Sequence, residues 1–147
     1  MNISTNYFMH NNLFKKIRDL VIIFFILIIF IAVIFIFFDE IKKNQKIKVS
    51  KENFYFVKEE ILISLKECND KVNEWIFGGS CKLLPKKENL EKYFNEERKI
   101  INPYDKSYGV NVNPGSVLIE ISQDKILISV DIDASGGIDI QHTFDLM

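Results

Sequence analysis

The sequence predicts an α+β protein, in which an N-terminal transmembrane helix continues into an amphipathic helix packed on a small antiparallel sheet. Three observations predict this fold class. Residues 20–38 are apolar without interruption, residues 54–72 repeat apolar positions every three or four, and residues 117–144 alternate apolar and polar positions. About 95 of the 147 residues remain for a soluble part, which is enough for one domain, residues 52–147.

The uninterrupted apolar segment runs from Leu20 to Phe38 and contains no charge, Pro or Gly. As a helix it spans about 28 Å, close to the thickness of the hydrocarbon core of a bilayer. A cleaved signal has a shorter apolar stretch and a small-residue cleavage site, and no Ala-x-Ala follows here. A buried helix this apolar needs a larger protein around it. We therefore predict an uncleaved span, with residues 1–19 as a basic cytoplasmic tail.

Basic residues flank the span on both sides. Before it stand Lys15, Lys16 and Arg18, and after it stand Lys42, Lys43, Lys46, Lys48 and Lys51. Counting these charges alone slightly favours a cytoplasmic C-terminus. The short N-terminal tail, with its basic residues tight against the span, and two cysteines able to form a disulfide favour the opposite orientation. We predict a single-pass protein of the inner (cytoplasmic) membrane whose C-terminal domain is periplasmic, or otherwise extracytoplasmic.

Charge is distributed unevenly along the chain. Residues 1–51 hold eight Lys or Arg against three acids, whereas residues 52–147 hold eleven against seventeen. A basic collar beside an apolar span suits the lipid bilayer, the first predicted partner. An acidic domain offers no basic stripe for a phosphate backbone, so nucleic acid is excluded as a partner. No small-molecule substrate is inferred.

No Gly or Pro occurs before Gly78, so one helix from Phe14 to beyond Cys68 is possible. Residues 39–51 are Lys-rich and form either a helical extension or a flexible stalk. Beyond them an apolar stripe follows the helical period, at Phe54, Val57, Ile61, Leu65, Cys68 and Val72. This stripe packs on its own domain or, alternatively, pairs with neighbouring copies. Gly78 and Gly79 are expected to end the helical region.

Two further groups of elements follow the glycines. Pro85 precedes a second expected helix, Lys86 to Lys99, with Leu90, Tyr93 and Phe94 on one side. The alternating region then predicts a three-strand antiparallel meander. Its apolar positions are Val117, Ile119, Ile121, Ile126, Ile128, Val130, Ile132, Ile138, Ile140 and Phe144. The polar partners are expected on a solvated face: Glu120, Ser122, Ser129, Asp131, Asp139, Gln141 and Thr143.

The two cysteines, Cys68 and Cys81, lie at a spacing that permits a disulfide. In an oxidising compartment the bond would stabilise the domain by about 3 kcal/mol on the loop-entropy model. The alternative is two ordinary thiols, one of them buried. Zinc and redox roles are disfavoured, because the pair is not Cys-x-x-Cys and no His is nearby. Trp75 and Phe77 form either a contact patch or, more commonly for aromatics at a helix end, part of the core.

The turn before the last strand is rich in oxygen side chains. Asp131, Asp133, Ser135 and Asp139 alternate with other residues around Gly136 and Gly137, a pattern typical of calcium loops. His142 stands where such a loop has a bidentate Glu, and strands flank the turn. Asp, Ser and Gly also build ordinary hairpin turns. A plain turn is the favoured prediction, with calcium as the alternative and no other cofactor.

The sequence contains few residues that could form a catalytic site. The two histidines are His10, across the span from the domain, and His142, at an expected solvated strand position. Glu59 and Glu60 are predicted to form a solvated helix face rather than an acid–base pair. We therefore predict that the protein is not an enzyme.

The order of elements resembles the type IV pilin and pseudopilin family: an apolar helix, an amphipathic helix, a Cys-bounded loop and a small antiparallel sheet. Local sequences at 66–69 (KECN), 77–81 (FGGSC), 102–104 (NPY) and 114–115 (PG) are similar to small bacterial pilin-like domains. The resemblance implies a subunit whose apolar helix rests in the inner membrane and then packs in the centre of a filament, with other pilin-like subunits as partners.

The family's processing signals are absent from the expected positions. Pilin precursors usually have a Gly before the peptidase cut and a Glu five residues after it, and here no Gly precedes the span and no Glu lies within it. We therefore predict a divergent, permanently anchored pilin-like component of a type IV pilus or secretion pseudopilus. The alternative is a membrane-tethered binding or adaptor domain that never polymerises.

Overall fold

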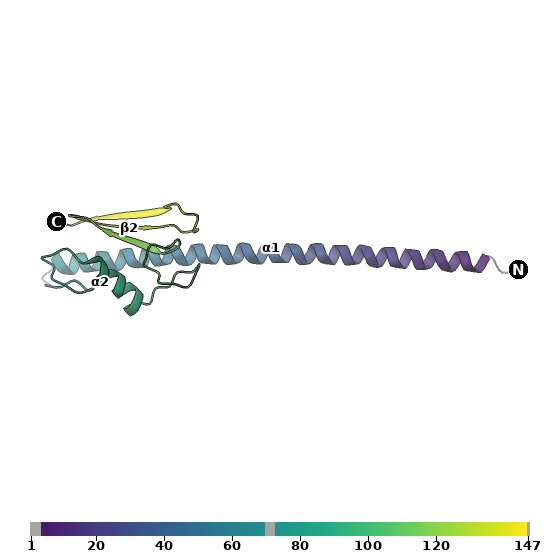
Figure 1. Ribbon diagram of the computed structural model, residues 1–147, viewed down its shortest axis with the longest axis horizontal. Helices are drawn as coiled ribbons and strands as arrows, with labels where there is room; N and C mark the ends of the chain where they lie inside the picture. Colours follow the sequence, from purple (N-terminus) through teal and green to yellow (C-terminus); the bar gives the residue numbers. More distant parts are fainter. Residues whose placement is uncertain (1–3, 70–72, 147) are drawn as a thin grey trace. The chain divides into compact units, whose positions relative to one another are not determined.

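The computed structural model describes the backbone of residues 4–69 and 73–146, and the side chains of residues 15–68 and 73–146. Its elements are α1 (Ser4–Asn69), α2 (Lys87–Lys92), the π-helix η1 (Tyr93–Glu97), β1 (Val117–Ile121), β2 (Lys125–Val130) and β3 (Ile140–Asp145) (Figure 1). The chain divides into two compact units, Met1–Lys42 and Lys43–Met147. The predicted combination of a long apolar helix with a small antiparallel sheet is confirmed.

The first unit contains the apolar part of α1. Within it, the large hydrophobic side chains from Leu20 to Phe38 are exposed, as expected of a segment whose surroundings are lipid. In the described part of the chain, one helix is long and apolar enough to cross a membrane. This finding is consistent with the predicted single-pass anchor.

The second unit begins with the remaining part of α1. Residues 41–51 are helical, which decides between the extension and the stalk in favour of the helix. One face of the following turns is buried, with Phe54, Val57 and Ile61 almost fully enclosed. Their spacing of three and four places them on one side of the helix, so the predicted stripe packs on its own domain. Val72 lies outside the described residues.

Two serines share this buried face of α1 and were not predicted to be there. Ser50 is buried and donates its hydroxyl to the carbonyl oxygen of Gly115, at 3.1 Å. Ser64 is also buried, and its hydroxyl accepts the backbone N–H of Ile76, at 3.1 Å. Each hydroxyl therefore ties α1 to a loop that contributes few regular backbone hydrogen bonds.

The prediction that Gly78 and Gly79 end the first helix was wrong, because α1 already ends at Asn69. The glycines instead form a tight turn, with φ values of 85° and 98°. That left-handed backbone region is accessible to Gly at little cost. The Gly78 N–H donates to the carbonyl of Trp75, at 2.8 Å, which closes the turn.

The second helical region is shorter than predicted and changes character partway. α2 ends at Lys92, and the π-helix η1 follows it directly. After η1, the Arg98 N–H donates to the carbonyl oxygen of Tyr93. Leu90, Tyr93 and Phe94 are buried together, as the sequence predicted. The helical region ends at Glu97, two residues before the predicted end at Lys99. Lys99 itself has a φ of 54°, which is incompatible with a right-handed helix.

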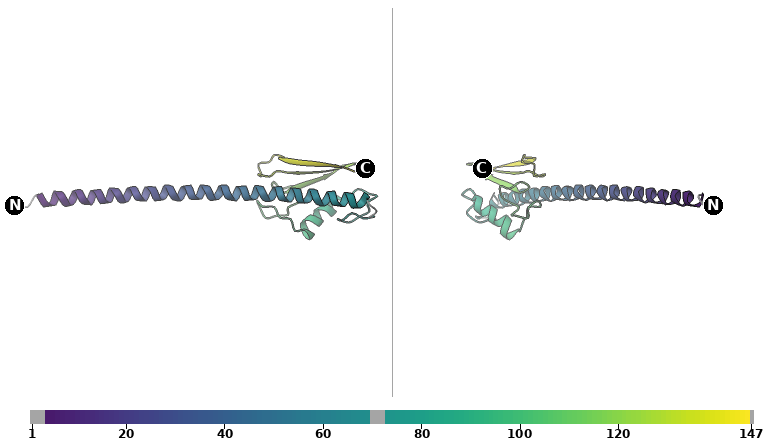
Figure 2. Two further views of the ribbon diagram at one scale, coloured as in Figure 1. Left: turned by 180° about the vertical axis from the view of Figure 1, so that it is seen from behind. Right: turned by 45° about the vertical axis from the view of Figure 1, so that its right-hand side comes forward.

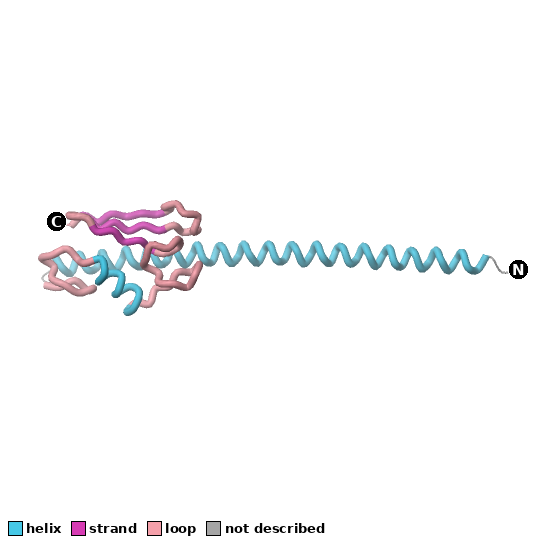
Figure 3. The backbone as a smooth tube through the Cα atoms, in the orientation of Figure 1, coloured by secondary structure: helices cyan, strands magenta, loops and turns pink. Residues whose placement is uncertain are grey.

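The sheet is the predicted antiparallel meander, in the order β1-β2-β3. Ile119 pairs with Ile128, and Ile128 with His142 across the other side. Figures 2 and 3 show the sheet running alongside the C-terminal part of α1, with α2 beside the same part. The buried side chains of helices and strands form one apolar cluster.

Three details of the sheet prediction were wrong. Ile132 and Ile138 lie in the loop between β2 and β3 rather than in strands, and Ile138 is exposed. Ser129 is buried, although its partner in β3, Gln141, is exposed on the outer face, as is Thr143. The reason is that residues 111–116 fold over this part of the outer face and line a cleft with Ser129.

His142 was expected in solvent but is half-buried, on the same sheet face as Ile128, its partner in β2. Its ring contacts that of Phe144, with centroids 4.7 Å apart. Burial, together with the charge of Lys58, lowers the pKa of His142 below its usual value.

This shift predicts an acid-sensitive contribution to stability. A histidine whose folded pKa is lowered stabilises the fold above its unfolded pKa, about 6.5, and loses that contribution as pH falls through the folded value. The free energy of unfolding of the wild type is expected to fall from pH 7 to pH 5 more steeply than that of His142→Gln. Parallel pH slopes for the two proteins would contradict the account.

Candidate functional site

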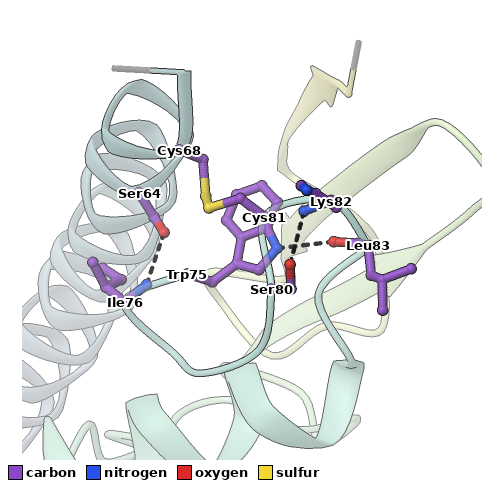
Figure 4. Close-up of a disulfide and its surroundings, with 8 residues drawn as sticks. All are labelled: Ser64, Cys68, Trp75, Ile76, Ser80, Cys81, Lys82 and Leu83. Atoms are coloured by element: carbon purple, nitrogen blue, oxygen red, sulfur yellow. Dashed lines mark hydrogen bonds between the residues drawn. A yellow bond between two sulfur atoms is a disulfide. The ribbon is translucent and has the colours of Figure 1, made fainter. Parts of the chain in front are cut away.

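The structure joins Cys68, near the end of α1, to Cys81 in a disulfide, so the predicted pairing is confirmed (Figure 4). The two Cα atoms are 5.5 Å apart. Within the loop that this disulfide closes, Glu74 and Ser80 pair in an isolated antiparallel bridge. The disulfide therefore fixes the loop that follows α1 to the end of the helix.

Trp75 and Phe77 within this loop belong to the core, which decides against the contact patch. Both are buried, and their rings stack with centroids 5.7 Å apart. The indole N–H of Trp75 donates to the carbonyl oxygen of Leu83, at 2.9 Å (Figure 4). Phe77 also meets Tyr93 edge-to-face. The loop thus supplies aromatic surface to the core beneath the disulfide.

A three-residue polar cluster joins α1 to η1. The Tyr93 hydroxyl donates to a carboxylate oxygen of Glu60, at 2.6 Å, and accepts from Nε of Arg98, at 2.7 Å. Arg98 also donates to both oxygens of Glu60, at 2.8 and 3.0 Å. Glu60 was predicted to be solvated, yet its side chain is only 14% exposed. No neighbouring residue in the sequence indicates that Glu60 is buried, because its partners are more than thirty residues away.

This cluster has a measurable alkaline signature. Burial, and then the hydrogen bond to Glu60, raise the pKa of Tyr93 to about 12. A raised folded pKa adds stability below the unfolded value of about 10, and that stability is lost as pH rises toward 12.

Tyr93→Phe removes the phenol and its hydrogen bonds to charged partners, and is expected to lower the free energy of unfolding by about 1 to 3 kcal/mol at pH 8. The difference between wild type and variant should shrink as pH rises above 10, when measured by urea unfolding in parallel. A difference that stays constant to pH 12 would show that the phenol proton is not held by the fold.

The loop between β2 and β3 brings together three of the four predicted calcium ligands. Asp131, Asp133 and Asp139 each offer a carboxylate oxygen, and these oxygens lie within 4.8 Å of one another. Hard oxygen ligands at such separations suit Ca²⁺. The backbone N–H of Ser135, the fourth predicted ligand, donates to carboxylates of Asp131 and Asp133, at 3.1 and 3.0 Å.

The same carboxylates also stabilise the loop by hydrogen bonds alone. Asp131 accepts the N–H of Gly136, and Asp139 accepts that of Ile132, at 2.8 Å. The contacts from Ser135 lower the pKa of Asp133. These bonds build an ordinary Asx-type turn, so the calcium site stays a prediction beside the plain turn.

Calcium titration separates the two interpretations. A cation held by three carboxylates raises the unfolding temperature with increasing Ca²⁺, and Asp131→Asn with Asp139→Asn abolishes the increase. A turn held by hydrogen bonds alone gives no increase at millimolar Ca²⁺. Magnesium serves as the control, because it demands tighter octahedral geometry.

Tyr104 contacts the loop between β2 and β3 and helps to hold it in place. Its hydroxyl donates to the carbonyl oxygen of Ile132, at 2.7 Å, and Lys46 Nζ lies over the Tyr104 ring, 5.2 Å from its centroid. Burial, followed by the charge of Asp133 and its neighbours, raises the pKa of Tyr104. This contact ties the β2–β3 loop to the first turns of α1 in the second unit.

The predicted membrane-flanking cations are exposed in the structure. These are Lys15, Lys16, Arg18, Lys42 and Lys43. Arg18 pairs with the neighbouring Asp19, at 3.3 Å, while both remain solvent-accessible. Such side chains are free to reach lipid headgroups.

The second unit leaves an apolar stripe on the outer side of α1. Val49, Phe56 and Ile63 repeat every seven residues, and they are 38%, 37% and 48% exposed. A repeat of seven keeps side chains on nearly one line along a helix. The buried positions, such as Phe54 and Val57, face another direction. This stripe was not singled out from the sequence.

A cleft of about 530 Å³ lies in the segment that follows η1. It is lined by Asn95, Lys99, Ile100, Ile101, Lys106, Ser107 and Tyr108. Ile101 and Tyr108 are largely exposed, although an isolated bridge pairs their backbones. Lys99 and Lys106 both have positive φ values, so this cleft depends on loop geometry that no sequence period reveals.

The candidate functional features are therefore a helix apolar enough to cross a membrane, a disulfide-bonded domain, an exposed apolar stripe on α1 and a cleft. Comparisons with protein-family models, with curated proteins and with solved structures found no match to this chain.

Proposed function

We propose that the protein is a single-pass membrane subunit, related in design to type IV pilins and pseudopilins, that acts as a structural or assembly component without catalysing a reaction. The observation that carries the proposal is α1 itself. The helix contains an apolar span, Leu20 to Phe38, and a later face that packs into a domain with an antiparallel sheet. This combination of roles in one helix is what the resemblance implies for a filament subunit.

The disulfide supports a location of the domain outside the cytoplasm. Disulfides persist in oxidising compartments such as the periplasm and are rare in the cytosol, where thiols are kept reduced. The bond between Cys68 and Cys81 closes the loop that contains the buried Trp75. The tail before the span would then lie in the cytoplasm of the cell, and the span in the inner membrane.

The exposed stripe on α1 supports assembly with other copies. The three apolar side chains lie along nearly one line of the helix and are each between 37% and 48% exposed. Val49, Phe56 and Ile63 lie on the part of α1 that belongs to the folded domain, so lipid does not explain their apolar character. A neighbouring subunit is the occupant that the proposed function provides.

The test is whether copies associate. Two versions of the full chain with different tags, produced in one cell and extracted in mild detergent, are expected to co-purify, and the protein should be recovered with filaments sheared from cells. Phe56→Asp is expected to reduce co-purification, whereas Tyr55→Asp, one position away, serves as the matched control. Recovery of monomers alone, with nothing in the filament fraction, would contradict the proposal.

A membrane-tethered adaptor that never polymerises is the second candidate. The observation that favours it is the span itself, which has no preceding Gly and no Glu within it. On this alternative the two tagged versions do not co-purify, and crosslinking captures a different protein in a fixed ratio to the chain.

A further inference from the structure

We propose that β3 accepts an extended, acidic segment of a partner protein as a fourth strand of the sheet, beside a basic flank of α1. Two features carry the inference: the backbone groups on the outer edge of β3, and the lysines on the neighbouring side of α1. This surface is separate from the stripe of Val49, Phe56 and Ile63. The inference therefore goes beyond the proposed function and stands whether or not copies associate.

The outer edge of β3 carries backbone groups that point away from the sheet, since β3 is the last strand in the order β1-β2-β3. In an antiparallel pair, residues that exchange backbone hydrogen bonds with the neighbouring strand alternate with residues that exchange none. The Leu146 N–H donates to the carbonyl oxygen of Asp124, at 2.6 Å, so the alternation directs the backbone groups of Gln141, Thr143 and Asp145 outward. In the described part of the chain, no other segment hydrogen-bonds to these groups. They are the donors and acceptors that an added strand requires.

The side chains of this edge leave it open to pairing. Sheet edges are protected in proteins by Lys, Pro or a bulge, or by a covering segment. Gln141 and Thr143 are exposed and uncharged, and β3 contains neither Lys nor Pro. Its carboxylate, Asp145, pairs with Lys125 of β2, at 3.7 Å. The outer strand on the other side differs, because Val110 bridges to the start of β1.

β3 borders the side of α1 that carries Lys58. On the opposite side, α2 packs beside β1, and the Tyr93 hydroxyl of η1 donates to Glu60 of α1. Lys58 comes two positions before Glu60, which places the two side chains about 160° apart around the helix. Burial, followed by the charge of Lys58, lowers the pKa of His142 in β3, which also locates Lys58 near this strand. A strand added to β3 therefore lies beside this flank of α1.

The flank is basic and partly apolar. Lys51, Tyr55, Lys58 and Leu62 follow at spacings of four, three and four, which keeps them on one side of the helix. Lys51 and Tyr55 are exposed, and the other two are half-buried. In the part of the chain that the structure describes, neither lysine takes part in an ion pair. Glu59 is rotated about 100° from Lys58, away from β3. An acidic segment with apolar residues complements this surface.

The added strand uses both features at once. It runs antiparallel to β3, the more stable pairing, and its alternate side chains point toward α1. Lys51 and Lys58 are about 10 Å apart along the helix, and four strand residues span about 13 Å, a difference that lysine side chains bridge. The occupant is therefore an extended segment with two acids four positions apart and, midway between them, an apolar residue that packs on Tyr55.

The first test adds a synthetic seven-residue peptide, with Thr at odd positions and Glu, Val and Glu at even ones, to the full chain in nanodiscs of zwitterionic lipid. Hydrogen exchange of single amides is measured with and without millimolar peptide. The amides of Gln141, Thr143 and Asp145 are expected to exchange about tenfold more slowly with peptide. Those of His142 and Phe144, which face β2, should hardly change. Absence of protection, or protection spread evenly over β3, would overturn the proposal.

A matched pair of modified peptides tests the backbone pairing. In the antiparallel arrangement the Thr residues of the peptide bond to β3, whereas the N–H groups of Glu and Val point away from it. N-methylation of the Thr residues is expected to abolish binding, measured by fluorescence polarisation of the labelled peptide. N-methylation of the Glu and Val residues should leave it. Equal binding by the two modified peptides, or the opposite order, would contradict the added strand.

Charge reversal tests the flank of α1. Lys51→Glu with Lys58→Glu is expected to weaken binding of the acidic peptide about tenfold and to strengthen binding of the same peptide with Lys in place of Glu, because the attraction is reversed. Lys82→Glu with Lys86→Glu, outside the surface, is the matched control, and an intact disulfide verifies folding. A loss no greater than that of the control, or no gain with the lysine peptide, would overturn the assignment of an acidic partner.

Discussion

Replacing Phe54 by alanine is expected to lower the free energy of unfolding by about 3 to 5 kcal/mol. Phe54 is 1% exposed and belongs to the apolar cluster between α1 and the sheet. Removing its ring deletes buried apolar surface and leaves a cavity that the surrounding side chains fill only in part. Urea unfolding of the detergent-solubilised chain, followed by the fluorescence of Trp75, measures the loss. Trp75 is the single tryptophan and is buried in the same cluster.

Phe56→Ala is the matched control, because it removes the same ring two positions along the same helix. Phe56 faces away from the core, so its loss is expected to change the free energy of unfolding by less than about 1 kcal/mol. The pair of variants separates stability from association, since Phe56 is assigned to contacts between copies. Equal losses for the two variants would show that the buried face of α1 is wrongly placed.

Removing the disulfide has the second largest expected effect on stability. Cys68→Ser with Cys81→Ser is expected to cost about 3 kcal/mol, the value that the loop-entropy model gives for a loop of this length. The two cysteines are 13 positions apart, and the loop between them carries Trp75 and Phe77 into the core. The same unfolding experiment measures the loss.

Reduction of the wild type provides the control for the double substitution. The reduced wild type and the double serine variant are expected to share one unfolding midpoint, below that of the oxidised protein. A serine variant as stable as the oxidised wild type would mean that the loop is held by its other contacts, such as the bond from Trp75 to Leu83.

Local periodicity was sufficient to predict the main elements. The uninterrupted apolar run, the spacing of Phe54, Val57 and Ile61, and the alternation through β1 and β2 each follow from which faces of a helix or strand are buried. The spacing of Cys68 and Cys81 permitted a disulfide, and with two cysteines in the sequence only one pairing was possible. These signals are contained within a few turns or strands of sequence.

Features that depend on distant partners were not predicted from periodicity. Ser50 is polar, yet the carbonyl of Gly115, 65 positions away, makes its burial favourable. Glu60 is largely buried because Tyr93, in η1, and Arg98, just after η1, donate hydrogen bonds to its carboxylate. Ile138 has strand-like alternation but lies in a loop.

Among the candidate functional surfaces too, those formed by contiguous residues were predicted and those formed by distant residues were not. The sequence located the anchor and the three aspartates of the β2–β3 loop, because both are contiguous in the chain. The cleft at residues 95–108 was missed, since it forms where Lys99 and Lys106 adopt left-handed backbone conformations after a π-helix. The exposed stripe of Val49, Phe56 and Ile63 emerges only once the core-facing side of α1 is known.

The most direct test of the central claim, a membrane-anchored subunit with a disulfide-bonded domain outside the cytoplasm, is thiol labelling of intact cells. A membrane-impermeant maleimide is applied with and without a prior membrane-permeant reductant, and labelling is scored at Cys68 and Cys81, the only cysteines in the chain. The account predicts labelling only after reduction. Labelling that requires a breached membrane and no reductant would place the domain in the cytoplasm and contradict the account.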